Sequence, residues 1–472
     1  MELLTLYKRP LRNWKQILLC STLLFVVGNA FSQREEEIKK YIPYDESSLV
    51  DFPLITIKVI AHVVQRDKKN PENFTDCEED RAIIQGVIDN CNAFYNKLSD
   101  PSIKVASNPP TIHDSRIRYR LDDIQFHVDS AGWDRNRMSI VIGHSWPMKV
   151  DSVDASSNKF IFNNLNAFRG FYRSDSLVVS TENGPITLHK KSVKKEGKTT
   201  VLVLKESLQD LKSDSIFNAT YFKKIDLNCS PDNWKNLTGS DPNYLHMFFT
   251  GASSKRIQFG CAPSPNYMNV SNFIFGGGWA GTKLTAHEIG HTLGLSHTNF
   301  PQFSDLPKKD KFCSGCKCDA TTISNNIMGY NGCRHYLSPL QIGHVYKNYS
   351  SLEKRIMITT ACDYDPELSI TVRGNEVWNR SRALQGNIIV KKKATLEINR
   401  NQFLAAGTTI FIEKRAKVIL NNTVISNGCQ NEWNGVVFCK KYKGEKTVPS
   451  RKKKGSLKLN GTSKLIKVKK AG

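Results

Sequence analysis

Acidic residues are scarce in this sequence, and several features that define common protein classes are missing. Asp and Glu total 44 against 67 Lys and Arg, which gives a formal net charge of +23. After residue 32, no apolar run approaches the roughly 20 residues that a membrane-spanning helix needs. No nucleic-acid-binding motif accompanies the positive charge, and aromatic residues are sparse among the lysines near the C-terminal end. The sequence therefore argues against a transmembrane span in the mature chain and gives no support for a specific nucleic-acid site.

The first 32 residues have the pattern of an export signal. An apolar run of eleven residues, Ile17 to Val27, precedes small residues around Ala30. Four positively charged residues come before this run: Lys8, Arg9, Arg12 and Lys15. We predict a signal peptide over residues 1–32 and a secreted or cell-surface protein, because the apolar run is short for a span; a membrane anchor is the alternative. Cys20 lies in a poor context for lipoprotein processing, so no lipid anchor is predicted.

Eleven of the twelve cysteines lie beyond the predicted signal peptide. Exported proteins meet an oxidising environment, so these cysteines are expected to form disulfides. Their odd number leaves at least one thiol unpaired or bound to a partner. The cluster Cys313-x-x-Cys316-x-Cys318 is also compatible with a second zinc site, although no fourth ligand is evident.

The first half of the chain has alternating strand and helix patterns. Residues 54–64 form an apolar, β-rich run that predicts a buried strand, and residues 117–128 alternate like a half-buried strand. Between them, residues 78–98 repeat apolar side chains at helical spacing. Residues 33–53 are polar and charged, and we interpret them as a short leader or pro-segment.

A less regular stretch follows at about 135–235, which we interpret as an insertion. It contains strand-like runs at 176–180, 186–189 and 199–204, separated by Gly-containing turns. Further strands are expected at 245–249 and 272–275, and a helix at 338–348. Beyond residue 363, short strands alternate with turns at 388–390, 394–398, 408–412 and 417–420, which indicates a small all-β module, either a β-sandwich or a β-solenoid.

The C-terminal module is rich in lysine, with runs at 391–393, 440–441 and 452–454. A basic surface favours anionic partners such as an acidic surface or a glycan. The alternative is a solvated basic face with no partner.

An eleven-residue motif begins at His287 and reads His-Glu-Ile-Gly-His-Thr-Leu-Gly-Leu-Ser-His. Positions i and i+4 of a helix share a face, so His287 and His291 can bind one metal ion. Gly294 is suited to end this helix with a positive φ, which lets the chain turn and His297 supply a third ligand. Three histidines plus water make an open, catalytic zinc site, and Glu288 is placed to take a proton from that water. The alternatives are histidines without a metal, or an inactive relative that keeps the ligands; retention of Glu288 argues against the latter.

The pattern HExxHxxGxxH resembles the signature of the metzincin zinc metalloproteases, in which a methionine-containing turn follows. Residues 325–330, Asn-Asn-Ile-Met-Gly-Tyr, are similar to that turn. The resemblance implies that Met328 forms an apolar floor beneath the histidines without binding the metal. It also places Tyr330 near the metal, where the hydroxyl either stabilises the oxyanion of the reaction or belongs to an ordinary turn residue.

Within the metzincins, the chain is most similar to the pappalysin-like (cytophagalysin) secreted proteases of bacteria. The similarity rests on VIAHVV in the first strand, IRYRLDDIQF in the second, and YLSPLQ at 336–341. It covers about 54–350, apart from the predicted insertion. Calcium-rich relatives carry acidic loops after the zinc motif, whereas residues 301–320 hold few carboxylates, so calcium binding has no support.

The resemblance implies an α+β catalytic domain at 54–360, with a mixed twisted sheet, an active-site helix and a Met-turn, followed by the small all-β module at 363–472. It further implies a secreted zinc-dependent endopeptidase whose extended protein or peptide substrate pairs with an edge strand, expected near 272–275. One alternative is an adhesin-like surface-binding protein whose protease domain is accessory or inactive. Another is a zinc hydrolase that acts on other bonds.

Overall fold

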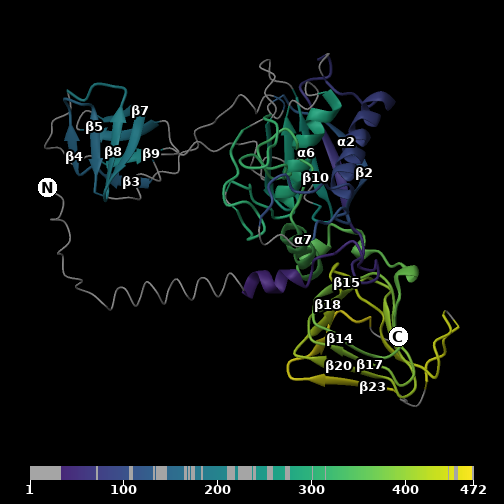
Figure 1. The fold of residues 1–472 in the computed structure, drawn as a ribbon. Coiled ribbons are helices and arrows are strands. Elements are labelled where there is room, and N and C mark those ends of the chain that lie inside the picture. Colours follow the sequence, from purple (N-terminus) through teal and green to yellow (C-terminus); the bar gives the residue numbers. More distant parts are fainter. Residues whose placement is uncertain are drawn as a thin grey trace, which may run out of the picture.

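The computed structural model describes most of the chain between residues 33 and 469 (Figure 1). The described residues are 33–70, 73–105, 110–130, 133, 146–163, 167, 171, 176–181, 184–209, 218–221, 237, 241–251, 259–271, 277–299, 301–313, 315–444, 446–450 and 455–469. The predicted signal peptide and the strand expected at 272–275 lie outside them. None of the helices in these ranges is both long enough and apolar enough to cross a membrane.

A five-stranded mixed sheet forms the centre of the first domain. Its strands run in the order β11 (Phe259–Ser264), β12 (Tyr267–Ser271), β10 (Leu245–Thr250), β1 (Ile55–Gln65) and β2 (Ile117–Val128). β1 is parallel to β10 and β2, β12 is parallel to β10, and β11 is an antiparallel edge strand. The strands predicted at 54–64, 117–128 and 245–249 are confirmed. The architecture combines helices with a larger share of strands, which is compatible with the predicted α+β class.

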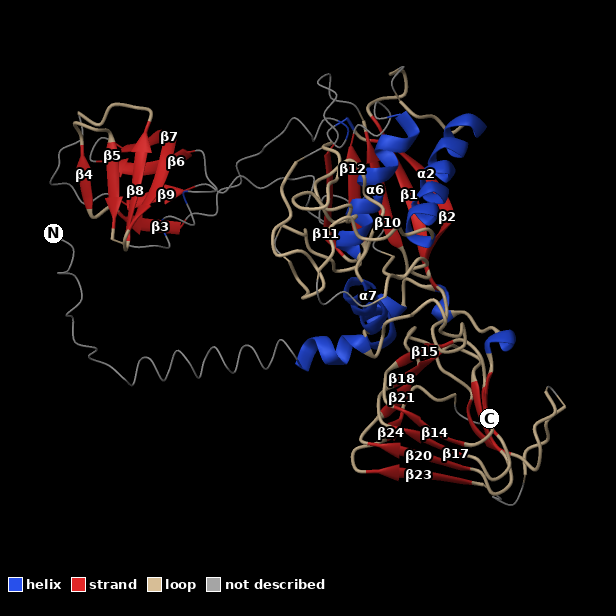
Figure 2. Ribbon diagram, in the orientation of Figure 1, coloured by secondary structure: helices blue, strands red, loops and turns tan. Residues whose placement is uncertain are grey.

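Helices α2 (Glu78–Asn96) and α6 (Gly277–Thr292) lie against one face of this sheet (Figure 2). Alternate residues of β1, including Ile57, Val59 and Ala61, point into the core between sheet and helices and are fully buried. The apolar face of the strand, with its period of two residues, thus packs against the apolar faces of the helices, with their period of 3.6, and together they form one core. The helix predicted at 78–98 is confirmed almost to the residue.

Residues 33–53 pack into the same domain. A short helix over residues 33–39 leads to Ile38, Tyr41 and Ile42, whose side chains are buried in the main core. The Glu35 carboxylate accepts a hydrogen bond from the backbone N–H of Ser304, at 2.8 Å. The stretch that the sequence suggested as a leader therefore contributes apolar surface to the folded domain.

The predicted insertion contains a separate seven-stranded sheet with its own apolar core. The strand order is β3 (Trp146–Lys149), β9 (Asn218–Tyr221), β6 (Ser176–Thr181), β7 (Gly184–Glu196), β8 (Thr199–Leu204), β5 (Lys159–Phe162) and β4 (Ser152–Asp154). Strands occur at the three positions predicted from the sequence, and β7 extends further than expected because it pairs with both β6 and β8.

The C-terminal module is a three-sided parallel β-solenoid rather than a sandwich. Each coil contributes one strand to each of three four-stranded parallel sheets, β13-β16-β19-β22, β14-β17-β20-β23 and β15-β18-β21-β24. The twelve strands are β13 (Ile370–Val372), β14 (Asn375–Trp378), β15 (Arg382–Leu384), β16 (Ile388–Val390), β17 (Thr395–Ile398), β18 (Gln402–Leu404), β19 (Thr409–Ile412), β20 (Lys417–Asn421), β21 (Val424–Ser426), β22 (Gly435–Phe438), β23 (Ser456–Asn460) and β24 (Lys464–Leu465).

Stacked side chains hold the coils in register. Branched apolar residues such as Ile370, Ile388 and Ile410 follow one another along the first sheet and face the interior. At the C-terminal ends of the strands of the second sheet, the side-chain amides of Asn379, Asn399, Asn421 and Asn460 form a continuous hydrogen-bonded ladder with N–O distances of 2.8, 2.9 and 2.7 Å. Since a one-residue slip would break every bond of the ladder, it fixes the register of the coils.

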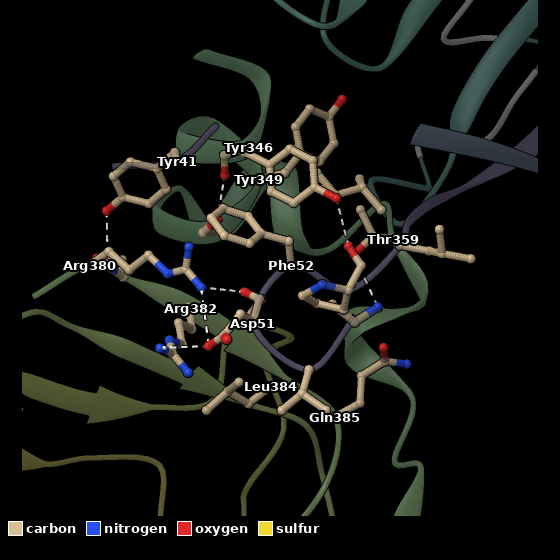
Figure 3. Close-up of a pocket in the computed structure, with 18 residues that line it drawn as sticks. Tyr41, Asp51, Phe52, Tyr346, Tyr349, Thr359, Arg380, Arg382, Leu384 and Gln385 are labelled. Carbon is tan, nitrogen blue, oxygen red and sulfur yellow. Dashed lines mark hydrogen bonds and ion pairs between the residues drawn. The ribbon is translucent and has the colours of Figure 1, made fainter. Parts of the chain in front are cut away.

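Helix α7 (Pro339–Ser351) lies between the five-stranded sheet and the solenoid (Figure 1). It begins at a capping box formed by Ser338 and Gln341, which confirms the helix predicted at 338–348. A cavity of about 40 Å³ lies at this junction, and Phe52 and Tyr346 contribute to its walls (Figure 3). Arg380 also lines it; its guanidinium stacks on Phe52, 3.8 Å from the ring centroid, and pairs with Asp51 at 3.7 Å. The disulfide Cys362–Cys429 further ties the end of the first domain to the solenoid.

Candidate metal and catalytic site

Helix α6 carries the first two histidines of the motif on one face, one turn apart. The helix ends at Thr292, and Gly294 follows with φ +90°. A bond from the Leu295 N–H to the Gly290 carbonyl, at 3.0 Å, closes this reversal. A residue with a Cβ atom is strained at such a φ, which explains the glycine. The turn brings His297 back beside the helix, as the sequence predicted.

The three histidines converge on one point. The Nε2 atom of His297 lies 2.9 Å from that of His291 and 3.1 Å from that of His287. One ligand atom from each of them lies within 4.8 Å of the others. Within the described residues, this triad is the group of His, Cys, Asp or Glu side chains that could hold a metal ion.

Backbone carbonyls fix the protonation of two of these rings. His287 Nδ1 lies 2.7 Å from the Ile327 carbonyl, and His291 Nδ1 lies 2.8 Å from the Leu295 carbonyl. A carbonyl only accepts, so both Nδ1 atoms carry the proton and both Nε2 atoms present lone pairs. If His297 Nε2 carries a proton, it can donate a hydrogen bond to the lone pair of His287 Nε2 or of His291 Nε2, but not to both. A cation between the three rings satisfies all of them, so the donor set fits a metal ion.

Burial keeps these imidazoles neutral, which is the form that binds metals. It lowers the pKa of His287 well below its usual value, with the Arg334 guanidinium adding to the effect. Burial also lowers the pKa of His291, and the pKa of His297 to about 4. At neutral pH the triad therefore offers lone pairs without first losing protons.

Glu288 follows the first ligand and lies beneath the edge strand β11. Its side chain is 5% exposed, and burial raises its pKa to about 8, against an opposing effect of Arg334. A Cβ atom on Gly260 of β11 would lie 2.5 Å from Glu288 Cγ. The edge strand can approach the carboxylate this closely only because residue 260 is a glycine.

The predicted Met-turn lies directly against α6. Met328 is fully buried, and its Sδ atom would be 2.1 Å from a Cβ atom on Gly290, which stands between the two helical histidines. The Met328 N–H donates to Asn326 Oδ1 at 2.9 Å, which shapes the turn. The side chain thus packs against the helix between the positions of the two ligands, where the resemblance placed it.

Tyr330 completes the predicted set. Its hydroxyl lies 3.0 Å from His297 Nε2, and its ring packs on those of His297 and Phe312 at centroid distances of 4.5 and 4.1 Å. The structure therefore brings His287, Glu288, His291, His297 and Tyr330 together, with Gly294 and Met328 as structural supports.

Arg334 is part of the site, although the sequence interpretation did not select it. Its guanidinium lowers the pKa of all three histidines and of Glu288, so it lies within electrostatic range of the whole group. Nη1 donates to the Lys283 carbonyl of α6 at 3.0 Å, and Nε is buried without a partner. The only sequence signal was a charged residue in an otherwise uncharged stretch after the Met-turn.

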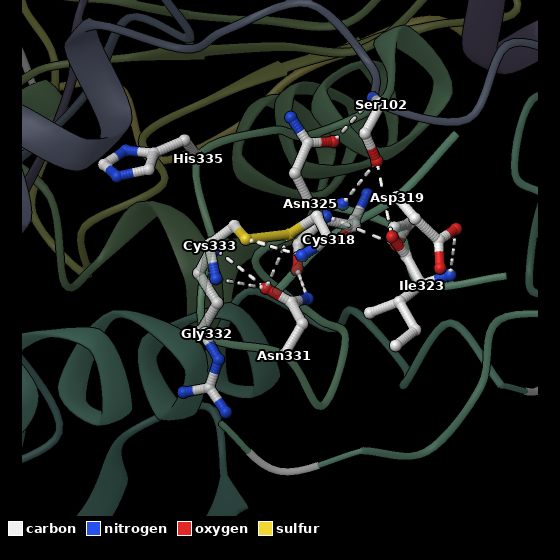
Figure 4. The surroundings of a disulfide bond; sticks show 12 residues. Ser102, Cys318, Asp319, Ile323, Asn325, Asn331, Gly332, Cys333 and His335 are labelled. Atoms are coloured by element: carbon white, nitrogen blue, oxygen red, sulfur yellow. Dashed lines mark hydrogen bonds between the residues drawn. A yellow bond between two sulfur atoms is a disulfide. The ribbon is translucent and has the colours of Figure 1, made fainter. Parts of the chain in front are cut away.

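Disulfides brace the segment that carries Tyr330 and Arg334. Cys318 pairs with Cys333, immediately before Arg334, and the Cys318 N–H lies 2.9 Å from the Cys333 sulfur (Figure 4). Cys313 pairs with Cys316. The three cysteines considered as a second zinc site are thus disulfide-bonded. Cys261 also forms a disulfide, whereas Cys77, Cys91 and Cys439 are free among the described cysteines.

A second histidine cluster lies on the sheet face opposite α6 and was not predicted. His62 on β1 bonds to His127 on β2 through Nδ1 and to His246 on β10 through Nε2, both at 2.9 Å. His246 Nε2 must donate to the Asp241 carbonyl at 2.8 Å, so every proton in the chain of neutral rings points towards Asp241. Burial is the main cause that lowers the pKa of His62, to about 2.

Comparison with known proteins adds no relative: no protein-family model matches the chain, and neither does any curated protein. The functional conclusion therefore rests on the residues and their geometry.

Proposed function

We propose that this protein is a secreted, zinc-dependent endopeptidase of the metzincin type, most similar to the pappalysin-like proteases. The observation that carries the proposal is the convergence of three neutral histidines beside a buried carboxylate, on a helix that ends at a glycine and rests on a buried methionine. A structural metal site would be closed by a fourth protein ligand, whereas this triad leaves a coordination position open. The disulfides favour an extracellular location.

His287, His291 and His297 would hold the ion. Bound zinc would supply Lewis acidity and lower the pKa of a coordinated water. The Glu288 carboxylate would take a proton from the attacking water and later pass it to the leaving amine. The raised pKa of Glu288 suits both roles, because a group that acts first as a base and then as an acid works best when its pKa lies near the ambient pH.

Tyr330 is placed to donate a hydrogen bond to the oxygen of the scissile carbonyl as negative charge develops there. Strand β11 has one free edge in the described sheet and passes over Glu288 at Gly260. An extended peptide that adds to this edge would bring its backbone to the carboxylate. We therefore propose β11 as the substrate-binding edge strand, while the strand expected near 272–275 lies outside the described residues.

Two measurements test the proposal. Purified protein with zinc should cleave casein, and a zinc chelator should abolish cleavage; equal cleavage in both conditions would sink the zinc mechanism. Glu288→Gln should retain bound zinc but lose at least about 100-fold in kcat/KM, because general-base catalysis contributes that much or more. If the Glu288→Gln protein keeps all biological effects of the wild-type protein, the result would favour the alternative of an adhesin-like surface-binding protein.

A further inference from the structure

Two lysine-rich runs of the sequence, 391–393 and 440–441, lie at one corner of the solenoid, whereas the run 452–454 is outside the described residues. The described residues that join the first sheet to the second are 373–374, 391–394, 413–416, 439–444, 446–450 and 455. We call these stacked turns the basic corner. The described Lys and Arg residues in it are Arg373, Lys391, Lys392, Lys393, Lys414, Arg415, Lys440, Lys441, Lys443 and Lys446.

The other two corners differ sharply in charge. The turns that join the second sheet to the third contain Arg380 and Arg400, of which Arg380 is half-buried against Phe52 and Asp51 of the first domain and Arg400 lies 3.8 Å from Glu37. The turns that close each coil, at 385–387, 405–408 and 427–434, contain neither Lys nor Arg. Among the three sets of turns, the positive charge is therefore concentrated in one, although Lys417, Lys458 and Lys464 are also exposed on the strands.

A single buried acid supports the basic corner from within. Glu413 is 4% exposed and pairs with Lys391 at 3.1 Å. It also accepts the backbone N–H groups of Lys392 and Tyr442, at 3.0 and 2.9 Å, so it joins the turns of three successive coils. The carboxylate of Glu413 thus compensates the positive charge of Lys391. Arg373, Lys392, Lys440 and Lys441 are exposed and make no ion pair with any described residue.

The spacing of the corner turns gives a linear array of charge. Neighbouring strands of the stacked sheets, such as β14, β17, β20 and β23, follow each other at about 4.8 Å (Figure 2). That interval is shorter than the Debye length of about 8 Å at physiological salt, so the cations of successive coils repel each other with little screening. A linear polyanion lying along the corner would relieve this repulsion and release its own counterions.

We propose that the basic corner binds a linear acidic polysaccharide along the stacking direction of the solenoid. Single-stranded nucleic acid is the weaker match, because its binders use grooves with aromatic rings on which bases stack. The aromatic ring described at this corner, Tyr442, is already engaged by Phe411, at a centroid distance of 4.8 Å, and by Lys391.

The experiment compares two full-length variants with the same change in net charge. The first replaces Arg373, Lys392, Lys440 and Lys441 by Gln. The second replaces four exposed lysines of the insertion sheet by Gln: Lys191, Lys194, Lys195 and Lys198. None of these eight residues forms an ion pair with a described residue or has a positive φ, so both variants should fold. The probe is a fluorescent heparin octasaccharide at 0.15 M NaCl, read by anisotropy.

We expect wild type to bind the octasaccharide, the corner variant to bind at least about tenfold more weakly, and the insertion variant to change by less than about twofold. Equal losses in both variants would show that only the net charge matters and would overturn the proposal. So would tighter binding of a single-stranded oligonucleotide of equal charge. In wild-type protein, the bound octasaccharide should protect Lys392, Lys440 and Lys441 from acetylation while Lys191 and Lys194 stay reactive.

Discussion

The contact between Gly290 and Met328 gives the sharpest test of how the metal site is built. A Cβ atom at residue 290 would lie 2.1 Å from Met328 Sδ, well inside the ordinary contact distance of about 3.5–4.0 Å. Met328 is fully buried, so its thioether has little room to move away. Overpacking of this kind costs about 1–3 kcal/mol, whereas an alanine in place of a helical glycine gains about 0.8–1 kcal/mol. The steric term should win, and Gly290→Ala should be destabilising by about 1 kcal/mol.

Gly86 on α2 is a matched control, because a Cβ atom there would meet nothing within 4 Å. Gly86→Ala should therefore show the propensity gain alone. For a domain of this size, about 1 kcal/mol corresponds to roughly 2–4 °C in Tm, so calorimetry should show a rise for Gly86→Ala and a fall for Gly290→Ala. Gly290→Ala should also weaken zinc binding in a chelator competition, because Met328 must shift against the ligand helix. A Gly290→Ala protein as stabilised as Gly86→Ala would refute the packing argument.

Three further predictions follow from the charges and disulfides. Arg334→Gln should retain zinc, but the acid limb of its pH profile of kcat/KM should move to higher pH, because the Arg334 guanidinium lowers the pKa of Glu288. An acid limb at the wild-type position would contradict this electrostatic role of Arg334. The folded-state pKa of His62 lies below its unfolded value of 6.5, so the unfolded chain binds more protons in acid and stability falls as pH drops below 6.5. The unfavourable protonation of His62 alone should lower the free energy of unfolding by about 2 kcal/mol between pH 8 and pH 5. If urea titrations show that His62→Gln loses as much stability in acid as the wild-type protein, the role given to His62 is wrong. Replacing Cys318 and Cys333 together by Ser opens a loop with a sequence separation of 15, which should cost about 3 kcal/mol and lower peptidase activity; an unchanged unfolding midpoint would argue against this brace.

Sequence alone located the histidine triad of the candidate metal site because its determinants are local. The histidines, Glu288 and Gly294 lie within one helix and its terminal turn, where spacing fixes which side chains share a face. Met328 was found by its resemblance to a known turn. The first strand, first helix and second strand were predicted correctly since each has a clear apolar period of two or 3.6.

The rest depended on contacts that no local pattern encodes. Arg334 lies in the site because the loop closed by the Cys318–Cys333 disulfide returns to α6, from which Arg334 is distant in the sequence. Strand β11 contains Gly260 and Pro263, which weaken a strand signal, and it forms by pairing with β12. The solenoid strands predicted at 388–390, 394–398, 408–412 and 417–420 are confirmed, but the other strands were missed because most have only three or four residues, too few to show a period. Two of its corner turns place Lys393 and Arg415 at positive φ, where glycine would have marked the turn.

The contacts of residues 33–53 with distant parts of the chain have a consequence for the order of folding. The Tyr41 hydroxyl accepts from the backbone of Ser381, a sequence separation of 340 residues. At typical synthesis rates of about 5–20 residues per second, this partner emerges roughly 15–70 seconds after Tyr41. Ile38 and Ile42 are covered earlier than this, because they pack in the main core and lie beside Gly343 of α7, which precedes the solenoid. The beginning of the domain is thus among the last parts to dock, and a nascent chain halted before α7 would still expose it.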